Sequence, residues 1–428
     1  MPHLLLAAVL VAHPADPIPL PPVTVPALQG VASPVHRIAS AEASPLDAKH
    51  DAAARKAMRS ALNWLRTHAD ERGGWLVDLR SGPTGTATAT LSPVNAAVSA
   101  LGLKAFVQAG ARPDNDPMLK SILQHLLARQ QTDGRFDDGS LSNYVTATIV
   151  ASLAAVDDDD RVQTAVHDGA AALRTLQWDK SEHIEPTNDW YGGAGYGNRG
   201  RPDLSNTQWM MEALHAAGDC SASKDAIGCD CDNDPSLRRA VAFLTRCQNA
   251  TTNAAPWAGD DGGFVYTPAN NGESMASERA GEGRYGEIMP ADARSLRSYG
   301  SMTYAGYKSL LFAGLPHDDP RVRAALTWIR AHWTLDENPG LGGQGYYYYL
   351  HGLARAMQAG GHAVLTDTEG TTHRWRQELV DALIARQHAD GHWTNEETRW
   401  LEGHSELATI YAVLALQETL KPPPPTAS

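Results

Sequence analysis

The main pattern along this chain of 428 residues is a recurring segment with one apolar stripe. In each copy, apolar residues stand two and six positions after a shared start. A step of four residues places two side chains on one face of an α-helix, so these segments are predicted to be amphipathic helices. Asp or Asn precedes most starts and Pro occupies several of them, as helix N-termini prefer. The starts are Pro117, Asp160, Pro235, Pro320 and His373, with a further copy near Lys56.

Between these amphipathic segments lie others that carry fewer charges and more small residues. Because they are apolar on several faces, we expect them to be buried inside a layer of amphipathic helices. Six such hairpins that close on themselves give an all-α fold, an (α/α)6 toroid over residues 51–420. An open superhelix is the alternative, since the sequence does not show closure. The inner helices are predicted at Val94–Ala109, Asn143–Val156, Thr207–Ala217, Ser301–Ala313, Tyr346–Gln358 and Glu406–Glu418.

The link between an outer helix and its inner partner has a sequence signature of its own. Gln130 and Gln387 each begin a Gln-x-x-Asp-Gly-x-aromatic stretch, and Gly262-Gly263-Phe264 is a longer-spaced copy. Gly adopts positive φ without a steric penalty and Asp bonds its own backbone, so each stretch predicts a tight turn. Two of these links carry insertions, at residues 178–204 and 250–297. All such links leave the array at one end, which is therefore the predicted functional face.

Tandem helices joined by these turns resemble the repeats of the terpenoid-cyclase and protein-prenyltransferase superfamily (the prenyltransferase and squalene oxidase repeat). The resemblance covers about Lys56 to Leu420. It implies a squalene-cyclase-like toroid and, as one possible activity, proton-initiated cyclisation or isomerisation of an isoprenoid. Fold alone does not fix that activity.

Class II cyclases of this superfamily share an Asp-x-Asp-Asp element whose acid protonates the substrate. Asp157–Asp160 is similar in composition, but it precedes an outer helix, where acids favour the helix N-terminus. The position that matches the element is Asp203, and there Ser205 and Asn206 stand in place of the other two acids. Asp203 is therefore the candidate proton donor, and an ordinary helix cap is the alternative interpretation.

Protein prenyltransferases of the superfamily hold zinc with Asp, Cys and His at inner-helix starts. The corresponding stretch here, Tyr299–Tyr304, has no thiol and no carboxylate. His404 could stand for the His alone, but one imidazole does not hold zinc. We therefore expect no metal and no cofactor.

Aromatic residues gather near the predicted starts of the inner helices. Such rings would suit an apolar polyene and a carbocation, and they would equally stack on a sugar or simply fill the core. The candidate ligand-binding residues are Trp190, Tyr191, Tyr196, Asn206, Trp209, Tyr299, Tyr304, Tyr346, Tyr347, His351 and Trp400.

Several ionisable residues lie beside these rings. A pair of carboxylates there could carry out acid/base chemistry on a polysaccharide, although capping or solvated positions explain each residue taken singly. The candidate catalytic residues are Asp203, Glu406 and His404, and the further acids are Asp189, Asp336, Glu337 and Glu402. Arg294, Arg297 and Arg399 are candidates for an anionic group or for pairing with these acids.

The net charge of −13 and pI near 5.7 argue against a nucleic-acid partner, because binding to phosphates needs basic patches. The apolar run Leu4–Ala12 is too short to span a bilayer and resembles a signal-peptide core, so residues 1–15 predict a periplasmic or secreted protein. A Pro-rich linker (16–50) and tail (421–428) flank the toroid. In an exported protein the closely spaced Cys220, Cys229, Cys231 and Cys247 favour disulfides over zinc.

These observations lead to three hypotheses. The first is a squalene-cyclase-like toroid that binds, cyclises or isomerises an apolar isoprenoid in an aromatic-lined centre. The second is a non-catalytic extracytoplasmic toroid that binds a ligand or a protein, and the third is a polysaccharide lyase or hydrolase on the same fold. The sequence leaves the substrate and the oligomeric state open.

Overall fold

The computed structural model describes residues 45–70, 74–77, 92–137, 139–156, 159–197, 200–220, 234–255, 257–268 and 297–422. The signal-like segment, nearly all of the Pro-rich linker, Arg294 and most of the tail lie outside these ranges. Within them, none of the helices has the length and apolarity needed to cross a membrane.

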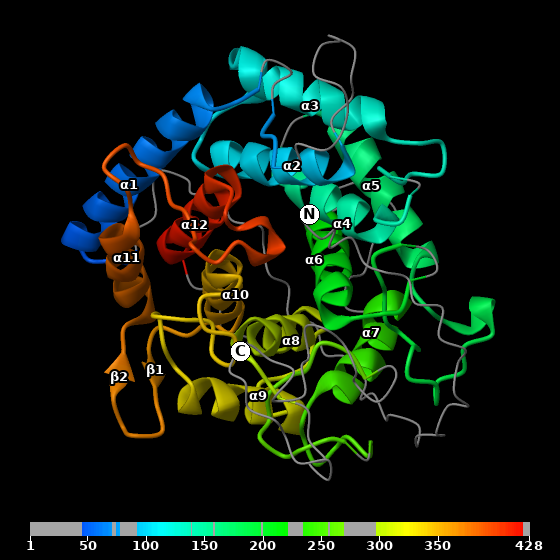
Figure 1. Cartoon of the computed structure of the whole chain (residues 1–428). Coiled ribbons are helices and arrows are strands. Elements are labelled where there is room, and N and C mark those ends of the chain that lie inside the picture. Colours follow the sequence, from blue (N-terminus) through cyan, green and yellow to red (C-terminus); the bar gives the residue numbers. More distant parts are fainter. Residues whose placement is uncertain are drawn as a thin grey trace, which may run out of the picture.

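The described part of the chain contains twelve α-helices in two layers (Figure 1). The mostly helical fold is thus confirmed, and inner helices begin and end within a few residues of their predicted positions. The outer helices are α1 (Ala48–Thr67), α3 (Pro117–Arg129), α5 (Asp160–Thr175), α7 (Pro235–Cys247), α9 (Pro320–Ala331) and α11 (Trp375–Arg386). The inner helices are α2 (Pro93–Gln108), α4 (Ser142–Leu153), α6 (Leu204–Cys220), α8 (Gly300–Phe312), α10 (Tyr346–Ala359) and α12 (Ser405–Leu420).

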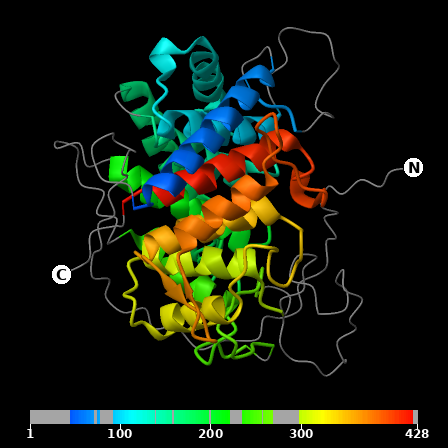
Figure 2. The same cartoon turned by 90° about the vertical axis from the view of Figure 1, so that its left-hand side faces the viewer.

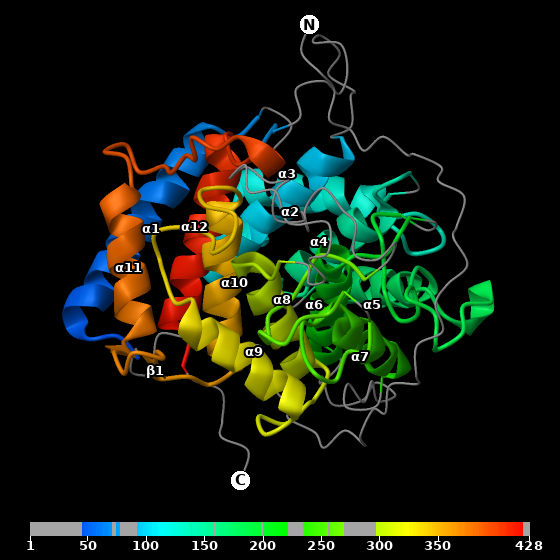
Figure 3. The same cartoon turned by 60° about the horizontal axis from the view of Figure 1, so that its bottom comes forward.

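The inner helices form a closed ring. Each inner helix contacts the next one along the chain, and α12 contacts α2, so the last repeat meets the first. At this junction α1 packs on both α11 and α12. Figure 2 shows the three helices side by side, with α1 in blue, α12 in red and α11 in orange. Figure 3 shows α9 outside α8, an outer helix covering its inner partner. The open superhelix is excluded for the described helices.

Two outer-helix starts differ from the prediction. Helix α1 begins at Ala48, within the predicted linker, because the Asp47 side chain accepts a hydrogen bond from the His50 N–H (3.0 Å) and caps it. His373, the predicted start of the last outer helix, instead pairs with Leu365 in a short hairpin of β1 (Leu365–Thr366) and β2 (Thr372–His373). Helix α11 therefore begins at Trp375.

The glutamine of the repeated turn ties neighbouring repeats together. The Gln130 side-chain amide donates to the Gly134 carbonyl (3.1 Å) in its own turn and to the Ala165 carbonyl (2.8 Å) on the next outer helix, α5. Gln387 makes the same pair of bonds to Gly391 and Ala57, and so links α11 to α1 and closes the ring. Gln248 and Gln177 repeat the arrangement. Gln177 was not identified in the sequence because an insertion separates it from its glycine.

The turn glycines are required by both conformation and space. Gly391 has φ of 107°, and a Cβ on it would lie 2.8 Å from the Ser60 carbonyl oxygen of α1. Gly370, in the β1–β2 hairpin, has φ of 90°, but a Cβ there would meet no atom within 4 Å. Both glycines therefore need a positive φ, but only Gly391 packs against a neighbouring helix, α1.

We expect Gly391→Ala to destabilise the protein more than Gly370→Ala. Both variants place a side chain at positive φ, which costs about 1–2 kcal/mol, and only Gly391→Ala also forces α1 away from the turn. Denaturant unfolding of the two variants measures the difference. Equal free energies of unfolding would show that α1 does not pack tightly on this turn.

The acid-rich stretch 157–160 was expected to favour the N-terminus of an outer helix, and its described part does so. The Asp159 side chain accepts from the Arg161 N–H (2.9 Å) and caps α5. Asp157 and Asp158 lie outside the described residues.

Candidate functional site at the centre of the ring

The tyrosine run at the start of α10 points in several directions, and Tyr348 alone faces the ring centre. The hydroxyl groups of Tyr346 and Tyr349 donate to the Leu335 and Thr334 carbonyls (2.6 and 2.7 Å), next to the outer helix α9. Tyr347 donates to the Thr394 carbonyl (3.3 Å). Consecutive helical residues differ by about 100°, so such divergence is expected. Tyr346 and Tyr347, predicted to bind the ligand, therefore do not line the centre.

Tyr348 reaches across the ring. Its hydroxyl oxygen accepts from the Gln208 side-chain amide (3.3 Å) and lies 3.5 Å from the Ser205 hydroxyl oxygen. Both partners are on α6, and α8 lies between α6 and α10 in the ring. Contacts between α10 and α6 side chains must therefore pass through the central space.

Tyrosines from other elements surround Tyr348, and we call this group the tyrosine cluster. Its ring centroids are 5.8 Å apart for Tyr348 and Tyr411 and 6.1 Å apart for Tyr144 and Tyr196. Tyr196 is exposed, and several other members are only half-buried, so the cluster presents aromatic surface that a ligand can touch. Tyr266 joins the cluster through its hydrogen bond with Tyr196, and Tyr299 through its proximity to Tyr348. The members are Tyr144, Tyr196, Tyr266, Tyr299, Tyr348 and Tyr411.

Asp203 lies at the edge of this cluster, immediately before α6. Its side chain is buried, and its two oxygens accept from the backbone N–H and the side-chain amide of Asn206, both at 2.8 Å. Burial raises the pKa of Asp203 to about 6, although Asn206 and the Tyr266 hydroxyl favour the ionised form. The carboxyl group thus caps the helix and also titrates near neutral pH, beside the tyrosines.

An open space adjoins Tyr348 on the same face of α10. Gly352 follows it by four residues and Arg355 by seven, so all three share one face of the helix. A Cβ on Gly352 would meet no atom of the described residues within 4 Å. Because Tyr348 and Arg355 both contact α6 across the ring, this space lies at the ring centre.

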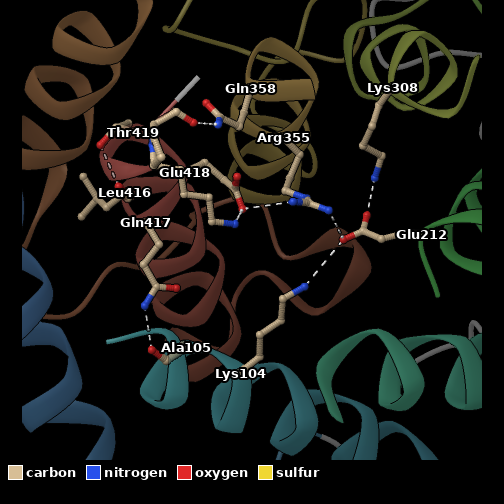
Figure 4. Close-up of polar contacts among 12 residues, drawn as sticks. Lys104, Ala105, Glu212, Lys308, Arg355, Gln358, Leu416, Gln417, Glu418 and Thr419 are labelled. Atoms are coloured by element: carbon tan, nitrogen blue, oxygen red, sulfur yellow. Dashed lines mark hydrogen bonds and ion pairs between the residues drawn. The ribbon is translucent and has the colours of Figure 1, made fainter. Parts of the chain in front are cut away.

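Beyond this space, buried charges from five inner helices meet (Figure 4). Glu212 of α6 pairs with Lys308 of α8, with Arg355 of α10 (3.2 Å) and with Lys104 of α2 (3.7 Å). Arg355 also pairs with Glu418 of α12 (3.4 Å), which holds Lys421 (2.6 Å). We call these six residues the charge cluster. Gln208 accepts from Lys308 (2.8 Å) and so joins the charge cluster to Tyr348.

Burial and neighbouring charges act in opposite directions on the pKa values of the charge cluster. Burial alone would raise the pKa of Glu212, but the adjacent cations Arg355, Lys308 and Lys104 hold it well below its usual value. Burial lowers the pKa of Lys104 to about 8, partly offset by Glu212. Burial also lowers the pKa of His351, which stacks on Tyr411, to about 3, so this histidine is neutral.

Other predicted ligand-binding residues lie in the core or at the rim. Trp209 and Tyr304 are fully buried, and Tyr304 packs edge-on against Tyr349 (5.6 Å). These two fill the core, which was the alternative interpretation. Trp190 packs edge-on against Trp178 (4.9 Å between ring centroids) in the half-buried loop before α6, next to Tyr191. Trp400 is 42% exposed, under the Arg399 guanidinium (4.6 Å), at the rim.

The remaining predicted acids have separate positions. Glu402 is buried and accepts from the N–H groups of Tyr347 (3.1 Å) and Tyr348 (2.7 Å), so it caps α10. Glu406 and His404 are half-buried at the start of α12. Asp336 is exposed beside Arg386 (3.4 Å). Glu337 is exposed and Asp189 is half-buried.

Within the described ranges no three His, Cys, Asp or Glu side chains are grouped as metal ligands. Cys247 is buried with a free thiol. Cys229, Cys231 and the side chain of Cys220 lie outside the described part, so a disulfide among these three stays a prediction, and Cys247 takes no part in one.

Comparison with known families supports the resemblance found in the sequence. Residues 77–257 match the family model of the squalene-hopene cyclase C-terminal domain, which confirms the similarity to terpenoid cyclases. No curated protein matches the chain.

Solved structures of two enzyme classes are similar to the chain. The chain is similar to a family 76 glycoside hydrolase from a bovine Bacteroides thetaiotaomicron strain, with 10% identity over 85% of this chain and 77% of that one and a TM-score of 0.52. It is also similar to a variant of the type II terpene cyclase MstE from Scytonema in complex with geranylgeranyl dihydroxybenzoate (13% identity, 87% and 99% covered, TM-score 0.47). At these identities the similarity concerns the fold and leaves the activity open.

Proposed function

We propose that this chain is a squalene-cyclase-like (α/α)6 toroid that binds an apolar isoprenoid chain at the ring centre. The observation that carries the proposal is the open space beside Gly352, next to the accessible faces of the tyrosine cluster. Aromatic rings pack well on a polyene and attract a carbocation to their faces. The terpenoid-cyclase-like sequence of residues 77–257 agrees with this ligand class.

If the protein is catalytic, Asp203 is the group best placed to protonate the bound isoprenoid. It lies beside the tyrosine cluster, and its raised pKa keeps a proton available near neutral pH. Its partners, Asn206 and Tyr266, stabilise the carboxylate that forms when the proton leaves. Ser205, which takes the place of an acid of the class II element, contacts Tyr348 instead.

A non-catalytic binding protein is the second candidate function. Both oxygens of Asp203 accept hydrogen bonds from Asn206, which is the arrangement of a helix cap and favours the ionised carboxylate. In this case the ring would hold the same isoprenoid ligand without transforming it.

Hydrolysis of a polysaccharide is less well supported. That chemistry needs two carboxyl groups facing one substrate. Glu402, the buried acid nearest the start of α10, uses both oxygens to hold the backbone of α10 and is not free to act with Asp203.

Gly352→Phe tests the binding proposal. Since a Cβ at this position meets no atom within 4 Å in the described part of the chain, we expect the variant to fold while its ring fills the space. Geranylgeraniol at 100 times its Kd should stabilise the wild-type protein by about 2.7 kcal/mol, measured by thermal shift, and should not stabilise the variant.

The control is Gln124→Phe on the exposed face of outer helix α3, which should keep the response to geranylgeraniol. Maltohexaose serves as the sugar probe. Stabilisation of the wild-type protein by maltohexaose alone, or an unchanged geranylgeraniol response in Gly352→Phe, would overturn the proposal.

A further inference from the structure

The charge cluster carries more positive than negative charge. Among the described residues it holds four cations (Lys104, Lys308, Arg355 and Lys421) against the two carboxylates Glu212 and Glu418. The neighbouring His351 adds no negative charge. Cations taken out of water without matching anions are costly to a folded protein. A structural network alone would need only as many cations as carboxylates.

The excess charge borders the open space. Arg355 is one helical turn beyond Gly352 on the same face of α10, and its buried Nε has no hydrogen-bond partner among the described residues. Lys104 makes the longest contact of the cluster, 3.7 Å to Glu212, so it is the cation least committed to a carboxylate. Guanidinium and ammonium groups in such a position bind carboxylate or phosphate strongly.

The separation of the aromatic and cationic parts suits an amphiphilic ligand. Tyr348 and Arg355 are seven residues apart on one helix, which corresponds to about 10 Å along its axis. A ligand with its chain among the tyrosines and its head beyond Gly352 would therefore span a length that prenyl chains readily cover. Its polar end would then lie away from Asp203.

We infer that the ring centre binds an anionic amphiphile, with the carboxylate or phosphate head group on Lys104, Lys308 and Arg355. This rests on the proposed function, because it takes the tyrosine cluster as the site of the chain. It adds a head-group site that the sequence analysis did not predict. None of the six residues of the charge cluster was a candidate ligand-binding residue, although their neighbour His351 was.

Isothermal titration calorimetry of the wild-type protein tests the head-group site with probes that share one chain: geranylgeraniol, geranylgeranoic acid and geranylgeranyl monophosphate. We expect at least one anionic probe to bind about tenfold or more tightly than the alcohol, and the stronger of the two identifies the head group. Inorganic phosphate alone distinguishes a site for free phosphate from one for the amphiphile.

Lys104→Met is the matched variant. If Lys104 binds the head group, the variant should lose about tenfold in affinity for the anionic probe, keep its affinity for geranylgeraniol, and melt no lower than wild type, because it removes excess charge. If Lys104 is only structural, the variant melts lower and affinity for both probes falls together.

The outcomes separate the two proposals. Equal affinity of wild-type protein for the alcohol and both anionic probes overturns the head-group site and leaves the proposed function standing. Absence of binding by all three amphiphiles overturns the proposed function itself. The wild-type comparison decides the matter even if Lys104→Met does not fold.

Discussion

Asp203→Asn is expected to lower turnover of a polyprenyl substrate by about 10²–10⁴-fold, the contribution typical of a positioned general acid. The amide cannot give up a proton, yet it keeps the shape of the carboxyl group. The fold should survive, because the buried Asn206 side-chain oxygen has no hydrogen-bond partner among the described residues and can accept from the new amide if the Asn206 amide turns over. Product analysis after incubation with geranylgeraniol measures the change.

The same acid predicts a pH dependence. Burial raises the pKa of Asp203 to about 6, so the protonated form required for proton transfer predominates below this pH and is lost above it. Turnover should therefore fall as the pH rises through about 6, and the residual activity of Asp203→Asn should not follow this profile.

Asp189→Asn is the control. Burial also raises the pKa of this half-buried acid, but Asp189 lies in the long loop 14 residues before Asp203 and does not belong to the start of α6. Its turnover should match wild type. Unchanged turnover in Asp203→Asn would remove Asp203 from the mechanism. Ligand binding without turnover in the wild-type protein would favour the non-catalytic alternative.

Glu212→Gln is expected to destabilise the protein by about 3–5 kcal/mol, the cost of breaking a buried ion pair by removing one partner. Glu212 faces Lys104, Lys308 and Arg355, and its loss leaves Glu418 as the one remaining carboxylate of the charge cluster. Glutamine keeps the volume, so a cavity does not contribute. Denaturant unfolding measures the free energy.

Glu369→Gln, at an exposed position in the β1–β2 hairpin, is the control and should change stability by less than about 0.5 kcal/mol. A comparably small effect for Glu212→Gln would mean that solvent reaches the charge cluster and screens it, contrary to its burial.

The helices could be predicted because their pattern is local. The four-residue apolar step and the Asp or Pro at most starts indicate where an outer helix begins, as at Asp116–Pro117 and Asp319–Pro320. Closure of the ring brings α12 against α2 and Gln387 into a hydrogen bond with Ala57 of α1. These contacts join residues at opposite ends of the fold, and no local pattern reveals them.

The site was harder to predict because it depends on which way each side chain points. Of the four consecutive tyrosines, Tyr348 is the one at the centre, whereas Tyr346 and Tyr347 were the predicted ligand-binding residues. Adjacent identical residues carry no sign of which ring faces inward. Tyr144, Tyr266 and Tyr411 stand alone in the sequence and were missed. The charge cluster did leave a signal: Lys104 and Lys308 are the single charged residues in the sequences of α2 and α8, and Glu212 follows an apolar stretch of α6. A charge in such a buried helix needs a buried partner.

The claim that the ring centre holds the isoprenoid is tested most directly by photo-crosslinking. A geranylgeraniol analogue with a diazirine on its chain would be bound to the wild-type protein, irradiated, and the labelled peptides mapped by mass spectrometry. We predict labelling of the α10 peptide that contains Tyr348 and Gly352, suppressed by excess geranylgeraniol and absent in Gly352→Phe. Labelling confined to the outer helices, or unaffected by Gly352→Phe, would contradict binding at the centre.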